Sequence, residues 1–457
     1  NSMEMILEFL RDVLSQPALL IGIMSCVGLI ALKRPFHKIM TGTLKPILGY
    51  LMLAAGAGVI VSNLDPLGKM IEHGFHITGV VPNNEAIVAV AQKVLGVETM
   101  SILVVGLLMN LLIARFTKFK YVFLTGHHSL FMACLMSAVL GTAGLSGIEL
   151  ILVGGFLMGA WSAISPAIGQ SYTSKVTDGD EIALGHFGSL GYYLSAWVAK
   201  YVGKAEESTE DIEIPEKWGF LRDSTLSTAL TMIVFYLIAA IAAGSEFVAT
   251  LSGSMSPYLF AVMSAMNFAV GVAIVYSGVR MILGDLIPAF QGIATKIIPN
   301  AIPAVDCAVF FTYAPTAVVL GFISSFIGGI IGMLILGAVG GVLIIPGLVP
   351  HFFCGATAGI YGNATGGRRG AAVGAFLNGL AITFLPALAL PVLGQLGFQN
   401  TTFGDADFAV MGLVLGNAFE WIGMAGIYGV VVIAALVLII PNFIKTKGKV
   451  INYVEEE

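Results

Sequence analysis

The chain has 457 residues, of which 57% are hydrophobic and only 11% are charged, and its mean hydropathy is +0.92. Soluble proteins carry about 25% charged residues, so this composition excludes an ordinary soluble domain and predicts a surface that faces lipid. The net charge of −5 and the lack of any run of Lys and Arg argue against a nucleic-acid partner.

Long apolar stretches follow one another along the whole chain. A helix that crosses a bilayer needs roughly 20 such residues. About eleven candidates begin in chain order near 17–32, 46–62, 98–114, 128–146, 147–166, 225–244, 256–280, 314–333, 334–349, 370–393 and 424–442. The segments 181–200, 283–312 and 350–366 are apolar but interrupted, which is typical of re-entrant hairpins. The sequence predicts an all-α polytopic membrane protein, with residues 1–457 forming one integral-membrane unit.

Basic residues concentrate in some of the connections between these stretches and are sparse in others. They occur within 33–45, 115–120, 200–222, 368–369 and 445–449, whereas 63–97 and 394–407 contain few. Because Lys and Arg mark cytoplasmic connections, this bias predicts an external N-terminus and a cytoplasmic C-terminus. Such an arrangement requires an odd number of crossings.

The two halves of the chain resemble each other weakly. Residues 56–66 and 278–288 both run from Gly to Pro over ten positions, and residues 149–155 resemble 333–341 further along. The shared order indicates an internal duplication, with repeats at about 17–220 and 225–442. Many transporters consist of inverted repeats that place the binding site at their interface.

Three ionisable residues lie in strongly apolar surroundings, and they are the candidates for a functional site. They are His127, His186 and Asp306. An ionisable group inside a bilayer costs roughly 2.5–3.5 kcal/mol on insertion scales, so such groups usually serve a site or a pathway. The composition and these residues together favour a transporter.

The chemistry of the three side chains suits a hydroxylated ligand. A neutral imidazole both donates and accepts hydrogen bonds, and a carboxylate accepts strong, charge-assisted ones. Structural roles stay open for each: His127 capping a helix end, His186 packed in a loop, and Asp306 paired with Arg280 or Lys296. The adjacent His128 is interpreted as structural.

Sequence signatures of covalent chemistry are absent. The chain contains no zinc-ligand spacing, nucleophile elbow, phosphate-binding loop or dinucleotide fingerprint. Its four cysteines lie in apolar stretches and are interpreted as small buried hydrophobes. We therefore expect no catalytic nucleophile, no metal and no cofactor in this chain.

Short motifs spread along nearly the whole chain, taken together and in order, resemble the ascorbate-type enzyme IIC (EIIC) of the bacterial phosphotransferase system. They are Gly42-Thr-Leu-Lys45, Ala55-Gly-Ala-Gly58, Leu124-Thr-Gly-His127, Val176-Thr-Asp-Gly179, Gly185-His186, Gly203-Lys204, Glu206-Glu-Ser208, Ser277-Gly-Val-Arg280, Ala304-Val-Asp-Cys-Ala308, Ala314-Pro315 and Ile344-Ile-Pro-Gly347.

This resemblance implies a homodimeric permease of the inner membrane with about eleven transmembrane helices and inverted repeats. It implies a substrate-carrying core domain that moves in elevator fashion against a dimerisation domain. The substrate would be phosphorylated on the cytoplasmic side by a soluble EIIB, which is supplied by EIIA and HPr. No EIIA or EIIB segment is recognisable within residues 1–457, so we expect EIIB to be a separate partner.

The resemblance also assigns a substrate site. Members of the family hold their ligand with two histidines and an aspartate that match His127, His186 and Asp306. The early glycine of the Ala-Gly-x-Gly motif matches Gly56.

The chain departs from the family pattern at three positions of this site. Phe131 and Phe187 replace two glutamines, and Glu85 aligns with a tyrosine. Losing two amides removes up to four donors and two acceptors, although an aromatic face can pack against the apolar side of a sugar ring. A change in hydrogen-bonding groups of this kind shifts specificity.

The sequence thus predicts a permease that imports a small hydroxylated substrate, with L-ascorbate first and another sugar, sugar acid, pentose or polyol as the alternative. A different hypothesis is a secondary transporter driven by protons or sodium, in which Asp306 or Glu85 is the titrating group.

Overall fold

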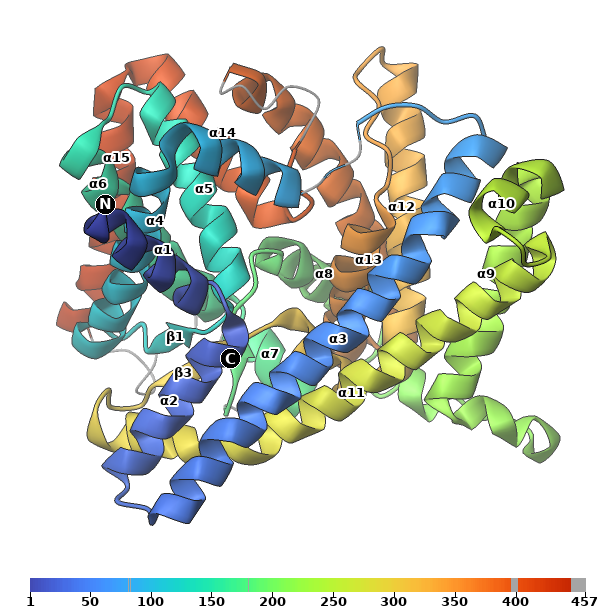
Figure 1. Cartoon of the computed structure of the whole chain (residues 1–457), viewed down its shortest axis with the longest axis horizontal. Coiled ribbons are helices and arrows are strands. Elements are labelled where there is room, and N and C mark those ends of the chain that lie inside the picture. The colour runs from blue at the N-terminus through green and yellow to red at the C-terminus, as the bar shows by residue number, and fades with distance from the viewer. Residues whose placement is uncertain (81, 83, 180, 396–401, 445–457) are drawn as a thin grey trace.

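The computed structural model describes residues 1–80, 82, 84–179, 181–395 and 402–444, without the side chains of residues 85–95, 221–222, 224 and 393–395. Most described residues are helical, and one three-stranded sheet lies among the helices (Figure 1). The elements are α1 (Ser2–Leu14), α2 (Pro17–Ala31), α3 (Phe36–Gly74), α4 (Asn84–Phe116), β1 (Tyr121–Phe123), α5 (Gly126–Thr142), α6 (Gly147–Ile168), α7 (Gln170–Thr177), β2 (Ala183–Leu184), α8 (Ser189–Val202), α9 (Ser224–Ala243), α10 (Ser245–Ser252), α11 (Pro257–Lys296), β3 (Ile302–Val305), α12 (Pro315–Ala338), α13 (Leu348–Gln395), α14 (Ala406–Ile422) and α15 (Met424–Ile439).

Eight helices in the described part of the chain are long and apolar enough to cross a membrane, or nine if the bent pair α1 and α2 forms one span. They lie within α3, α4, α6, α9, α11, α12, α13 and α15. These helices confirm the prediction of an all-α polytopic membrane protein, apart from the short sheet. The figure of eleven crossings stays a prediction.

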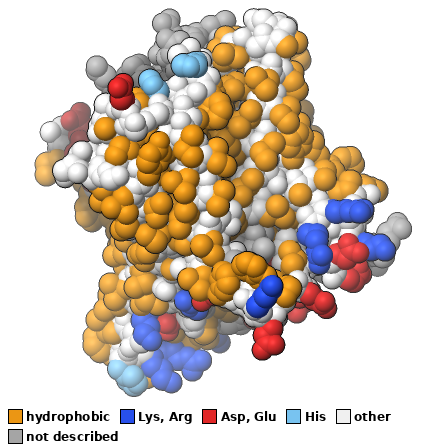
Figure 2. Space-filling model, turned by 90° about the vertical axis from the view of Figure 1, so that its right-hand side faces the viewer, with side chains coloured by type: hydrophobic (Ala, Val, Ile, Leu, Met, Phe, Trp, Pro, Cys, Tyr) orange, Lys and Arg blue, Asp and Glu red, His pale blue; other side chains and the backbone are white. Residues whose placement is uncertain are grey.

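The surface has the character of a membrane protein. Hydrophobic side chains cover the middle of the face drawn in Figure 2, and charged side chains gather toward its lower part. On α9, for example, Val234, Ile238 and Ile241 are all more than half exposed. Extended apolar surface of this kind is rare on soluble monomers, so these faces suit contact with lipid.

One predicted span differs from the structure. The span near 334–349 is wrong, because α12 ends at Ala338 and residues 339–347 are not helical. Gly340 there has φ = 74°, a backbone conformation that ends a helix and that glycine adopts without strain. Residues 350–366 lie in the first arm of α13, and the chain turns back at Gly367, where φ is 65°. A Cβ on Gly362 would lie 2.4 Å from the carbonyl oxygen of Gly370, so the two arms pack against each other. That this segment enters the membrane without crossing it stays a prediction.

The helices form two packing groups. In one, α4, α5, α6, α14 and α15 surround their own hydrophobic core. In the other, α3 packs against α2, α9 and α11, while α12 packs along α13. The sheet and the helices α7 and α8 lie between the two groups (Figure 1).

The long helices α3 and α11 run side by side across the molecule in antiparallel directions (Figure 1). Glycines let their backbones touch: a Cβ on Gly278 would lie 2.6 Å from the carbonyl oxygen of Gly49, and one on Gly56 would lie 2.7 Å from that of Gly271. Small residues are the usual means of close helix approach in membranes. The sequence-similar segments 56–66 and 278–288 thus lie on helices that pack against each other.

This contact predicts the effect of adding one methyl group on α11. Gly278→Ala should destabilise the protein by about 1–3 kcal/mol, because the new Cβ overlaps the α3 backbone and forces the helices apart. Gly284→Ala is the matched control, since a Cβ there meets nothing within 4 Å, and alanine favours a helix. Thermal unfolding of the purified protein in detergent measures both. Equal melting temperatures for the two variants would contradict the packing account.

Candidate functional site

The sheet brings distant segments of the chain together. Its strands are parallel in the order β1-β3-β2, with Phe123 opposite Ala304 and Leu184 opposite Val305. Because the strands are parallel, their carboxyl ends lie at one edge of the sheet. Leu124 follows β1, Gly185 follows β2 and Asp306 follows β3, so the three predicted motifs emerge at the same edge.

Local chemistry explains how such short strands pair. Pro303 in the central strand has no N–H to donate, but it faces the side where β2 has not yet begun, because β2 pairs only from Ala304 onward. Gly185 continues the pairing by donating its N–H to the carbonyl of Val305 at 2.8 Å. A Cβ at Gly185 would lie 2.4 Å from the carbonyl oxygen of Ala304, so this close approach requires glycine.

Asp306 and His186 face each other at this edge. Both are buried, with 9% and 4% of their surface exposed. Tyr50 of α3 donates its hydroxyl to Asp306 Oδ2 at 2.8 Å, while Asp306 Oδ1 lies 3.9 Å from His186 Nε2. On its other side His186 Nδ1 accepts the N–H of Gly188 at 3.3 Å and lies 2.8 Å from the hydroxyl of Tyr192. The structure therefore brings together two of the three residues singled out in the sequence.

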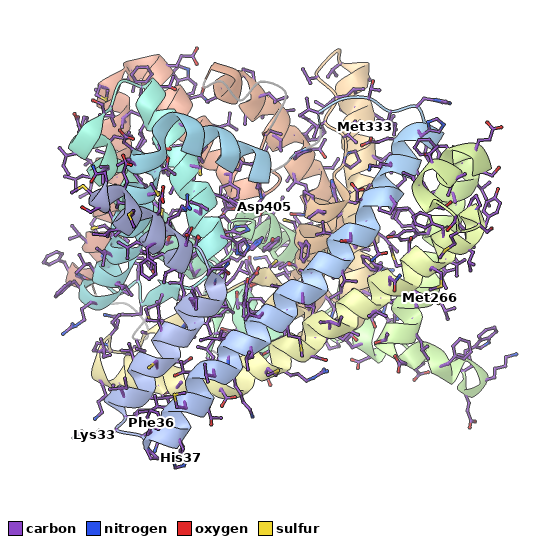
Figure 3. All side chains as sticks on the ribbon, in the orientation of Figure 1. Lys33, Phe36, His37, Met266, Met333 and Asp405 are labelled. Atoms are coloured by element: carbon purple, nitrogen blue, oxygen red, sulfur yellow. The ribbon has the colours of Figure 1, made fainter. Side chains whose placement is uncertain are left out.

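A second carboxylate also lies near His186 Nε2. Asp405, labelled near the centre of Figure 3, precedes α14 and is 5% exposed. Its Oδ2 lies 3.4 Å from His128 Nε2 and 3.9 Å from His186 Nε2, and its Oδ1 accepts from Cys354 Sγ at 3.2 Å. The rings of His128 and His186 are 3.9 Å apart between centroids. His128 is thus part of this cluster of buried polar side chains.

The neighbouring carboxylate of Asp407 links several elements around the site through hydrogen bonds. It accepts hydrogen bonds from Ser189 Oγ at 2.6 Å, from the N–H of Leu190 at 3.0 Å and from Trp161 Nε1 at 3.2 Å. The N–H of Asp407 in turn donates to the carbonyl of Phe187 at 3.0 Å. This residue therefore ties the start of α14 to the loop that carries His186.

The third predicted residue, His127, lies in the first turn of α5 and is half-buried. It is close enough to Asp306 and His186 to interact electrostatically with both. Its ring packs edge-on against His128 and Phe131, with centroids 4.9 and 5.8 Å apart. Phe131 thus forms an apolar wall beside the histidines.

The remaining predicted residues have different surroundings. Phe187 is fully buried and stacks on Phe123 with centroids 4.6 Å apart, while its N–H donates to His128 Nδ1. Gly56 lies in the contact between α3 and α11. Glu85 lies outside the residues whose side chains the structure describes. The contact of each with a substrate stays a prediction.

The ion pair that the sequence leaves open for Asp306 is not formed in the described structure. Arg280 and Lys296 are both exposed, and Arg280 hydrogen-bonds to Ser277. Asp306 instead faces Tyr50 and His186.

The ligand atoms of His128, His186 and Asp405 all lie within 4.8 Å of one another, a spacing that could hold a metal. The hydrogen bonds argue otherwise. Each imidazole accepts a backbone N–H at Nδ1, so the neutral ring carries its proton on Nε2, the atom that faces the carboxylates. Histidines that bind a metal donate from the nitrogen that does not bind it, so the site is built to donate hydrogen bonds.

Sequence reasoning missed Tyr50, Asp405 and the participation of His128. Tyr50 lies in an otherwise ordinary apolar helix, and nothing local marks it. Asp405 and Asp407 had a signal: two carboxylates within three residues at the start of an apolar stretch. The sequence places them in an external connection, whereas both side chains are buried.

A comparison with models of protein families shows which family the chain belongs to. A model of the sugar-specific permease component of the phosphotransferase system matches residues 12–407. The chain belongs to this permease family. The match includes all three strands and the buried residues at their ends, and it makes the protein a multi-pass membrane protein.

A curated relative is the ascorbate-specific EIIC component of the phosphotransferase system from Mycoplasma pneumoniae. It is 26% identical to this permease in an alignment 417 positions long that covers 78% of this chain and 62% of the relative. The chain therefore spans less than two thirds of the length of the relative.

The hydrogen bonds of His128 and His186 predict that a metal chelator does not change the stability of the protein. EDTA should leave the melting temperature of the purified protein unchanged, and Zn²⁺ should not raise it, because both Nε2 atoms carry protons. A rise with Zn²⁺ that disappears in His128→Phe would contradict this description of the site.

Proposed function

We propose that this chain is the permease component that carries a small hydroxylated substrate across the membrane, and that His127, His186 and Asp306 bind it. The observation that supports this most strongly is their convergence at the carboxyl ends of three parallel strands, in a chain that belongs to the permease family. Buried donors and acceptors of this kind match the hydroxyl groups of a sugar or sugar acid.

L-Ascorbate is the first candidate substrate, supported by the relative from Mycoplasma pneumoniae. Phe131 provides an aromatic surface next to His127 and His128, and such a surface packs against a ring or a carbon chain. Phe187 is withdrawn into an aromatic cluster and offers the site only backbone groups. Another sugar, sugar acid or polyol is therefore the alternative.

We propose that transport is coupled to phosphorylation of the substrate, as the resemblance to the ascorbate-type EIIC family implies. A separate soluble EIIB, supplied by EIIA and HPr, phosphorylates the substrate on the cytoplasmic side of the inner membrane. Two copies of the chain form a homodimer, and the part that carries the sheet moves in elevator fashion against the part that contains α3 and α11. The antiparallel contact of α3 with α11 supports inverted repeats, and the two packing groups support a core and a dimerisation domain.

A second candidate function is proton- or sodium-coupled transport. It is favoured by Asp306 and Asp405, two buried carboxylates that both lie 3.9 Å from His186 Nε2. Membrane vesicles loaded with or without phosphoenolpyruvate and the soluble proteins that pass its phosphoryl group to the substrate (the enzyme that phosphorylates HPr, then HPr, EIIA and EIIB) separate the two functions. Accumulation that requires these additions, and is insensitive to an ionophore, supports the phosphotransferase permease. Accumulation without them that collapses with an ionophore supports the second candidate.

The proposed site predicts that Asp306→Asn and His186→Ala abolish uptake while leaving assembly intact. Each lost contact with a charged or buried polar group costs roughly 1.5–3 kcal/mol, which is about a tenfold to hundredfold loss of affinity. Uptake of labelled ascorbate and of a sugar and polyol panel into cells expressing each variant, normalised to membrane protein, measures the effect.

Asp65→Asn is the control for the loss of a carboxylate in this protein. Asp65 is exposed and pairs only with Lys69 among the described contacts. The variant should retain uptake. Wild-type uptake in both site variants would overturn the assignment of the site.

A further inference from the structure

The Nε2 atom of His186 lies near two carboxylates without being hydrogen-bonded to either. It carries the ring proton, because Nδ1 accepts the N–H of Gly188. Asp306 Oδ1 and Asp405 Oδ2 each lie 3.9 Å from Nε2, which is beyond hydrogen-bonding distance. A buried donor thus lies near two carboxylates and is hydrogen-bonded to neither of them.

A ligand hydroxyl fits between an imidazole N–H and a carboxylate. Its oxygen accepts from Nε2–H and its proton is donated to the carboxylate, so all three groups are satisfied. Both carboxylates offer this arrangement, but Nε2 carries a single proton. Two hydroxyls on neighbouring carbons of one ligand would share that proton in a three-centre hydrogen bond, and each hydroxyl would donate its own proton to one carboxylate.

We propose that Asp405 is a second substrate-binding carboxylate, and that Asp306 and Asp405 recognise two neighbouring hydroxyl groups of one ligand next to His186 Nε2. This inference rests on the proposed function, because it assumes that the cluster is the substrate site. It adds a binding residue that comes from the start of α14, and it defines the ligand as one that carries a vicinal diol.

Comparison with Asp407 shows why Asp405 is suited to a ligand. Asp407 accepts three hydrogen bonds from Ser189, Leu190 and Trp161, all at 3.2 Å or less. Asp405 accepts from the thiol of Cys354, a weak donor, and lies 3.4 Å from His128 Nε2. A carboxylate has about four acceptor sites, so Asp405 keeps capacity for a further strong donor.

The surroundings of Asp405 orient it toward His186. His128 is held by the N–H of Phe187, which fixes its Nε2–H toward Asp405 Oδ2. Cys354 of α13 occupies Oδ1. The oxygen that faces His128 is therefore also the one that faces His186.

The test compares ligands that differ by one hydroxyl. Binding to the purified full chain in detergent is measured by thermal shift and calorimetry for L-ascorbate and 6-deoxy-L-ascorbate, and for hexitols and their monodeoxy analogues. In the wild type we expect at least one diol to bind about tenfold to a hundredfold more tightly than its deoxy partner, the range of a hydrogen bond to a charged group. In Asp405→Asn this ratio should fall below about threefold.

Asp65→Asn is the control for the loss of a carboxylate, since Asp65 is exposed and pairs with Lys69. It should keep the wild-type ratio between diol and deoxy ligand, because this carboxylate is not part of the buried cluster. Asp405→Glu is the second variant if Asp405→Asn does not fold. It keeps the charge, displaces the carboxylate by one methylene, and should also reduce the ratio.

The outcomes separate this inference from the proposed function. If Asp405→Asn weakens both ligands of a pair equally, or binds both as the wild type does, Asp405 is structural and the inference is wrong. If no hydroxylated compound binds the wild type, the proposed function fails and the inference fails with it.

Discussion

The parallel pairing of three very short strands is the constraint on which the site depends. Together β1, β2 and β3 contain only nine residues, yet they join segments that are more than one hundred residues apart. Parallel strands place their carboxyl ends at one edge, so the residues that follow each strand are brought together. The buried histidines and Asp306 meet for this reason, and not because any one helix carries them.

Contacts from both helix groups complete the site. Tyr50 reaches Asp306 from α3, and Asp407 binds the start of α14 to the loop before α8. The site is therefore held between two separately packed parts of the molecule. A movement of one part relative to the other changes the contacts of Asp306 directly, which links the geometry of binding to the transport movement that we propose.

The fold class and most helices could be predicted, because the apolar stretches are long and a bilayer demands helices. The short strands could not be predicted. Tyr121–Phe123 and Ile302–Val305 are apolar like much of the chain, and their pairing depends on residues far away in the sequence. His186 and Asp306 were found as ionisable groups in apolar sequence, and the structure brings them together. Asp405 carried the same signal but lay in a segment interpreted as an external connection, and Tyr50 carried none because its partner is 256 residues away.

The most direct measurement of the central claim is an experimental structure of the full chain in a lipid nanodisc with a transported substrate bound. The account predicts ligand density at the carboxyl ends of the three strands, within hydrogen-bonding distance of His186 and Asp306. An ordered substrate at any other place in the molecule, with these two side chains untouched, would contradict it.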